Sequence, residues 1–148
     1  MHTIRKANAS DLDQLSVLFN AYRVFYKKEP DLKGANDFLK ARMHDNDSEI
    51  FVCEEEKTLT GFVQLYPLFS STRMKKLWLL NDLFVDSTNR RKGISVALLE
   101  KAKELCRETG ACGMYLETAK SNVIGNQLYP RTGFVLNSDH NFYDWDTQ

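Results

Sequence analysis

The segment that most constrains the fold of this chain runs from Leu77 to Thr118. It begins with "LWLLNDLFVD", a nearly continuous apolar run interrupted only by Asn81 and Asp82, which is typical of a central strand buried on both faces. Apolar residues then recur at helical spacing in "NRRKGISVALLEKAKEL", and "CGMYLET" predicts a second strand. Because such a strand–helix–strand unit joins parallel neighbours by a right-handed crossover, it predicts an α/β domain.

The flanking segments predict the rest of a mixed sheet. A first strand in "HTIRKA" precedes a helix that we expect to start with Ser10 and Asp13 as a capping pair and to end near Lys27. A second helix, "ANDFLKARM", precedes a hairpin formed by "EIFVCEE" and "LTGFVQLYPLF". At the carboxyl end we expect a short helix in "NVIGNQLY" and a final strand in "NFYDW", whose edge could pair across a homodimer.

Length, charge and cysteine use narrow the possible classes of protein. A chain of 148 residues fits a single domain, 1–148. Its 20 basic and 20 acidic residues cancel, so the overall charge predicts neither nucleic-acid nor membrane binding, and any anion site must be local. No signal-peptide pattern or bilayer-length apolar run is present. The three cysteines cannot all pair with one another and fit a reducing compartment, so we expect a cytoplasmic protein. The scattered histidines predict no metal site.

Three cationic residues lie between a predicted strand and the helix that follows it. Arg90, Arg91 and Lys92 precede Gly93 and the small Ser95 at the start of the predicted helix. The first N–H groups of a helix have no intrahelical acceptor and carry partial positive charge, so additional cations there are unfavourable unless an anion binds. The pattern therefore indicates a pyrophosphate site, although a solvated, charged helix end is the alternative.

A second motif specifies the family that the chain resembles. The segment "SNVIGNQLYPRTGF" carries an Asn-x-x-small-x-x-Leu-Tyr pattern followed by Gly-Phe, through Asn122, Gly125, Leu128, Tyr129, Gly133 and Phe134. Together with the Arg-x-x-Gly-x-Ser segment, it resembles the GNAT family of acetyl-CoA-dependent N-acetyltransferases, most closely bacterial members and the diamine and thialysine acetyltransferase branch. The resemblance implies a GNAT fold, an α/β domain whose mixed central sheet has splayed parallel strands 4 and 5 flanked by about four helices.

The resemblance also implies how acetyl-CoA would bind. It assigns the pyrophosphate to the segment Arg90, Arg91, Lys92, Gly93, Ile94 and Ser95, the last of these at a position where the family prefers Gly or Ala. It assigns the pantetheine arm to the backbone of Leu83, Phe84 and Val85, as in strand addition. A backbone N–H near Phe84 or Val85 would donate a hydrogen bond to the thioester oxyanion, and Asn122 would contact the cofactor.

For catalysis, the resemblance implies that Tyr129 is the general acid, whereas a tyrosine packed on a short helix is the alternative. A glutamate often stands at the position of Asn81 in the diamine branch, and Asn81 itself cannot take up a proton. We therefore expect Asn81 and Asp82 to order a water that removes the proton of the amine, unless Asp82 is only a buried carboxylate that caps loop N–H groups. Pro130 departs from the family, and we expect the last helix to end by Tyr129.

The acceptor is expected to be a primary amine of a small molecule or a lysine-like side chain, attacking the thioester directly. Tyr22 and Tyr26, with Glu29 and Asp31, could give an aromatic and acidic lining that suits a cationic amine, although core tyrosines and solvated acids are the alternative. A CoA-binding regulatory module with little turnover and a protein N-acetyltransferase remain the alternative functions.

Overall fold

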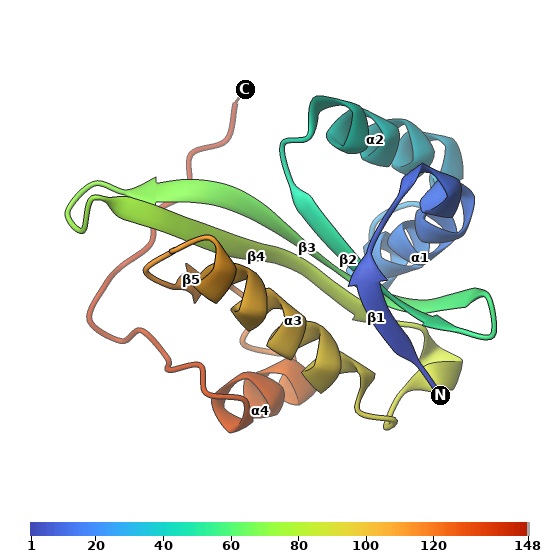
Figure 1. Ribbon diagram of the computed structural model, residues 1–148. Helices are drawn as coiled ribbons and strands as arrows, with labels where there is room; N and C mark the ends of the chain where they lie inside the picture. The colour runs from blue at the N-terminus through green and yellow to red at the C-terminus, as the bar shows by residue number, and fades with distance from the viewer. Residues whose placement is uncertain (148) are drawn as a thin grey trace. The chain divides into compact units, whose positions relative to one another are not determined.

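The computed structural model of the protein describes residues 1–147, which form two compact units, residues 1–117 and residues 118–147. The first unit contains a five-stranded sheet whose strands lie in chain order (Figure 1). The strands are β1 (Thr3–Lys6), β2 (Glu49–Glu55), β3 (Thr58–Ser70), β4 (Lys75–Val85) and β5 (Met114–Tyr115). The first four pair antiparallel and β4 pairs with β5 in parallel, which confirms the predicted mixed sheet and its strand–helix–strand unit.

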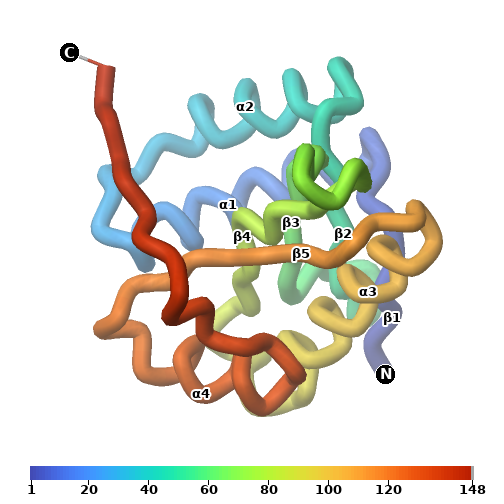
Figure 2. Tube along the Cα trace, turned by 90° about the vertical axis from the view of Figure 1, so that its left-hand side faces the viewer, coloured from blue at the N-terminus to red at the C-terminus, as the bar shows by residue number. Residues whose placement is uncertain are grey.

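The helices of the first unit cover both faces of this sheet. They are α1 (Leu12–Phe25), α2 (Leu32–Asp45) and α3 (Ile94–Glu108), together with the short 3-10 turns η1 (Ala9–Asp11) and η2 (Ser87–Asn89). Figures 1 and 2 show α1 and α2 side by side on one face and α3 on the opposite face. The second unit contains α4 (Val123–Arg131). No helix within residues 1–147 has the length and apolar character needed to cross a membrane.

The apolar core between the sheet and α1 follows from the spacing of large side chains. Leu15 of α1 and Leu39 of α2 are fully buried, and they share one cluster with Val52 of β2 and Phe62 of β3. On α3 the buried side chains lie on one face of the helix, whereas Val96 is only half-buried. They are Ile94, Leu98, Leu99, Ala102, Leu105 and Cys106. The sheet is therefore held between two apolar layers, and this fixes the position of the carboxyl end of β4.

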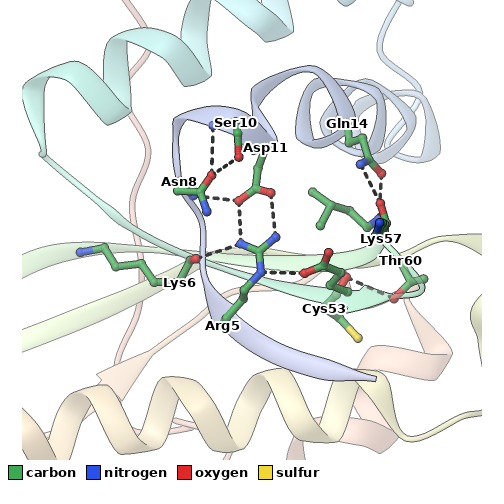
Figure 3. Close-up of polar contacts among 11 residues, drawn as sticks. Arg5, Lys6, Asn8, Ser10, Asp11, Gln14, Cys53, Lys57 and Thr60 are labelled. Carbon is green, nitrogen blue, oxygen red and sulfur yellow. Dashed lines mark hydrogen bonds and ion pairs between the residues drawn. The ribbon is translucent and has the colours of Figure 1, made fainter. Parts of the chain in front are cut away.

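An ion-paired arginine fixes the connection from β1 to α1 (Figure 3). Both terminal nitrogens of Arg5 donate to the Asp11 carboxylate at 2.8 Å, and Nε donates to Glu54 at 2.8 Å. Asn8 and Asp11 form the capping box here, so the predicted Ser10–Asp13 cap is wrong. The reason is that Asp11 already accepts from Arg5, which places the start of the helical segment two residues earlier than the hydrophobic spacing indicates.

The predicted final strand does not form. Residues 141–145, "NFYDW", contain no strand, and Phe142, Tyr143 and Trp145 are 70%, 89% and 83% exposed. Strand propensity needs a hydrogen-bonding neighbour, and no ladder within the described residues includes this segment. The homodimer expected from this edge stays a prediction.

The last helix also differs from expectation, because α4 continues through Pro130 to Arg131. Proline removes a single N–H near the end of the helix, and the last turn is stabilised by other bonds instead. Gly133, at a φ of +96°, donates its N–H to the carbonyl of Pro130, and Phe134 donates to that of Tyr129. This is a Schellman arrangement, so the helix ends at Arg131, where Gly133 closes it, and not at the proline.

Candidate functional site

A bulge in β4 brings Asn81 and Asp82 together. Along the ladder with β3, Gln64 lies opposite Asp82 while Leu65 lies opposite Leu80, so Asn81 is the extra residue. The Asn81 side-chain nitrogen donates to both Asp82 carboxylate oxygens, at 3.2 and 3.1 Å. Two adjacent side chains that regular alternation would separate therefore form one unit.

The two residues of this unit differ in their exposure to solvent. Asn81 is exposed, whereas Asp82 is only 5% exposed. Burial raises the pKa of the Asp82 carboxyl, and hydrogen bonds from Asn81 and Tyr22 oppose part of that rise. A carboxyl group whose pKa is raised in this way is a better proton acceptor than a solvated aspartate.

Tyr22 connects this unit to a pocket between α1 and α2. The Tyr22 hydroxyl donates to the Asn81 carbonyl at 3.4 Å, and its ring packs edge-on against Phe84 of β4. The pocket has a volume of about 370 Å³ and is lined by both predicted acceptor residues, Tyr22 and Tyr26, and by Asp31. Glu29 is not among the lining residues, although its carbonyl accepts a hydrogen bond from Arg23.

Beyond the bulge, one edge of β4 has no strand partner within residues 1–147. The predicted strand "CGMYLET" is only two residues long, because its ladder with β4 ends at the pair of Leu79 and Tyr115. Leu83, Phe84 and Val85 pair with β3 along the other edge of β4. Beyond Tyr115 the two parallel strands thus no longer hydrogen-bond, as the splayed arrangement requires, and the open edge of β4 can accept an extended ligand.

The segment that connects β4 to α3 is shaped by Asp86. Its carboxylate accepts from the Thr88 backbone N–H and from the Asn89 side chain, and so organises η2. Gly93 stands at the N-cap with a φ of +78°, in the left-handed region that favours glycine. Asp86 is not among the predicted site residues, although "DST" carries an N-cap signal that indicates this turn.

The start of α3 has the electrostatic features of an anion site. No side chain caps the helix, and its first turn holds no acidic residue. Arg90, Arg91 and Lys92 are exposed immediately before it. Arg90 is held over the rings of Phe25 and Phe84 at 5.5 and 5.7 Å, and Lys92 lies 3.9 Å from Glu55. Uncapped N–H groups and three adjacent cations supply the hydrogen-bond donors and positive charge that suit a pyrophosphate. Ser95, in the first turn, is half-buried.

Tyr129 and Asn122 belong to the second unit. Asn122 caps α4, since its side-chain oxygen accepts from the Gly125 N–H at 3.1 Å while its nitrogen donates to Thr118. Tyr129 is half-buried, and its ring packs edge-on against Phe134 at 5.7 Å. The motif residues therefore form a compact local structure, in which a Cβ at Gly125 would displace the Asn122 side chain that caps α4.

Comparison with known proteins decides the family. The profile of the acetyltransferase (GNAT) family matches residues 13–134. The chain belongs to the GNAT family. It is 44% identical over 131 residues to an uncharacterised N-acetyltransferase of Bacillus subtilis, YhfO, with 88% of each chain covered. It is also similar to the crystal structure of a probable acetyltransferase, with a TM-score of 0.92, 34% identity, and coverage of 99% of this chain and 98% of that one.

A more distant solved structure shares only the fold of this GNAT protein. A predicted acetyltransferase from Clostridium acetobutylicum, solved with acetyl-CoA, has a TM-score of 0.79 and 16% identity, with coverage of 97% of this chain and 96% of that one. The GNAT fold and the named N-acetyltransferase relatives together make this protein an acetyltransferase. The α/β fold class predicted from sequence is thus confirmed, whereas membership of the diamine branch stays a prediction.

Two of the cysteines of this GNAT protein, Cys53 and Cys106, are poorly suited to act as nucleophiles. Cys53 and Cys106 are buried, and burial raises the pKa of both thiols. Cys112 is half-buried, and all three are free. A buried thiol held in its protonated form is a weak nucleophile, which favours direct transfer to the acceptor over an acyl-enzyme.

Proposed function

We propose that this GNAT protein transfers the acetyl group of acetyl-CoA to a primary amine of a small molecule or a lysine-like side chain, by direct attack of the amine. The observation that carries the proposal is the bulge at Asn81, which holds the buried Asp82 carboxylate beside an exposed amide. The pocket lined by Tyr22 and Tyr26 would hold the acceptor, and the Tyr22 hydroxyl links it to this unit.

The residues around β4 and α3 fit acetyl-CoA. Acetyl-CoA supplies an acetyl thioester, an extended pantetheine arm and a pyrophosphate. The segment Arg90, Arg91, Lys92, Gly93, Ile94 and Ser95 would hold the pyrophosphate through backbone N–H groups and cations. The open edge of Leu83–Val85 would bond the pantetheine arm, and an N–H of Phe84 or Val85 would stabilise the charge that develops on the carbonyl oxygen. Asn122 would contact the cofactor from the second motif.

Proton transfer is assigned to three residues. An alkyl amine is mostly protonated at neutral pH, so it must lose a proton before its nitrogen can bond to the acetyl carbon. Asp82 would accept this proton through a water that Asn81 orders. As the carbon–sulfur bond breaks, Tyr129 would donate a proton to the departing thiolate. The second proton that the attacking nitrogen loses would restore the Tyr129 phenol, so that the products are an amide and a neutral thiol.

The test is thiol release from acetyl-CoA with a panel of primary amines. We expect amine-dependent release, and a decrease of kcat of about 100-fold or more in Tyr129→Phe, which keeps the ring but loses the proton donor. Tyr143→Phe is the matched control, because Tyr143 is 89% exposed. Tight acetyl-CoA binding without release for any amine would instead identify a regulatory module, and release only with peptide amino termini would identify a protein N-acetyltransferase.

A further inference from the structure

The pocket between α1 and α2 has an aromatic wall and charged side chains of both signs. Its aromatic lining consists of Phe19, Tyr22, Tyr26 and Phe38. The rings of Phe19 and Phe38 stack at 5.6 Å, and those of Tyr22 and Tyr26 meet edge-on at 5.1 Å. Phe19 and Tyr22 also pack against Phe62 of β3, so the rings form a firm surface for a flat or apolar ligand body.

The charged side chains of the pocket do not balance. Arg23 and Lys28 contribute two positive charges, and Asp31 contributes one negative charge. No ion pair within the described residues includes Arg23 or Lys28. The Asp31 carboxylate caps α2, because it accepts a hydrogen bond from the Gly34 N–H at 2.9 Å. The lining therefore carries an excess of positive charge.

Tyr22 sets the direction in which an acceptor lies. Its hydroxyl meets the Asn81 carbonyl, so the reacting amine belongs at the end of the pocket next to Asn81 and Asp82. Arg23, the next residue on α1, is held in place by its bond to the Glu29 carbonyl at 2.9 Å. The amine would thus lie toward the buried carboxylate, while the other end of the acceptor would meet the cations.

We propose that this pocket binds an acceptor amine with an aromatic or apolar body and a carboxylate at its far end, an inference that rests on the proposed acetyl transfer. A polyamine is disfavoured, because its second cation would meet Arg23 and Lys28. The acidic lining expected from Glu29 and Asp31 is thereby replaced by a basic one. The aromatic rings hold the body of the acceptor, and the two cations select the charge of its tail.

Three probes that differ only in that tail test the proposal. Para-(aminomethyl)benzoate, para-(aminomethyl)benzamide and para-xylylenediamine share a ring and a reacting amine, and carry an anionic, a neutral and a cationic far end. We expect kcat/KM to fall in that order. Arg23→Gln should lower kcat/KM for the benzoate about tenfold and leave the benzamide nearly unchanged. Lys28→Gln should act in the same direction more weakly, because Lys28 is exposed.

Asp31→Asn should change kcat/KM for the benzoate in the opposite direction. Asparagine can still cap α2, so the variant should fold, and loss of the negative charge should raise kcat/KM for the benzoate about twofold to threefold. Lys40→Gln is the control, because it removes an exposed cation of α2 that does not line the pocket. Preference for the diamine, or equal losses for benzoate and benzamide in Arg23→Gln, would overturn the proposal while leaving acetyl transfer intact. Absence of thiol release with every amine would refute the proposed function itself.

Discussion

Replacing Asp82 by asparagine tests whether the bulge of β4 holds a proton acceptor. The substitution keeps the shape of the side chain and removes only its ability to take up a proton. A general base contributes about 100-fold to 10,000-fold to a rate, which corresponds to about 3 to 5 kcal/mol of activation free energy. We therefore expect kcat/KM for a primary amine to fall by at least 100-fold, measured by thiol release.

The pH dependence of the wild-type protein sharpens this test. Because burial raises the pKa of Asp82 above 3.8, the base becomes available only above that raised pKa, and kcat/KM should show an acid limb there. Asn81 donates to the carboxylate and lowers its pKa. Asn81→Ala should therefore move the acid limb to higher pH, whereas Asp82→Asn should abolish it.

Stability measurements separate this loss of activity from unfolding. A raised folded-state pKa means that the folded protein binds the proton more tightly than the unfolded chain, so ionisation of Asp82 lowers stability as pH rises through the window between the two pKa values. Asp82→Asn should thus be at least as stable as the wild type at neutral pH. If the variant keeps kcat/KM within about threefold and retains the acid limb, then Asp82 is not the base and only caps loop N–H groups.

Three further substitutions test the fold and the cofactor site. Asp11→Ala should lower the free energy of unfolding by about 3 kcal/mol, because it leaves Arg5 without its two-pronged partner. Since Arg5 lowers the pKa of Asp11, the difference in free energy of unfolding between wild type and variant should be present above pH 3.8 and shrink as pH falls through the lowered pKa. Denaturant titrations at neutral pH and at a pH below the lowered pKa would show this change. Gly93→Ala should lower the free energy of unfolding by about 1 kcal/mol, because of the positive φ, and should weaken acetyl-CoA binding measured by calorimetry. Unchanged stability and affinity would contradict this prediction. Ser95→Ala should weaken acetyl-CoA binding about fivefold if its hydroxyl bonds a phosphate, and unchanged affinity would show that the serine is only tolerated.

The elements that could be predicted from sequence are those with strong local signals. The apolar run around β4 and the helical spacing of α3 predict a parallel strand pair. Both apolar surfaces are buried only when the helix packs against the sheet that contains the two strands. The final strand at residues 141–145 was predicted on the same kind of pattern and is wrong. Apolar and aromatic residues there indicate a strand only if a neighbouring strand exists, and that depends on tertiary structure.

The details of the site depend on interactions that local patterns do not encode. The end of α4 is set by Gly133 and its two capping bonds, which outweigh the single N–H lost at Pro130. The capping box of η1, which leads into α1, includes Asp11, and Asp11 is held by Arg5, a residue on another element. Likewise the basic lining at Arg23 and Lys28 was missed, because whether a helix-end cation faces water or a pocket depends on how α1 packs against α2.

The bulge at Asn81 explains how a neutral residue can stand at this point of the strand. In a regular strand, Asn81 and Asp82 would face opposite sides of the sheet, and an asparagine facing the acceptor could not take up its proton. The extra residue lets the Asn81 amide reach both oxygens of the Asp82 carboxylate. In the proposed mechanism, the exposed amide would order a water and the buried carboxylate behind it would receive the proton. The two functions that one glutamate could combine would then be divided between adjacent residues.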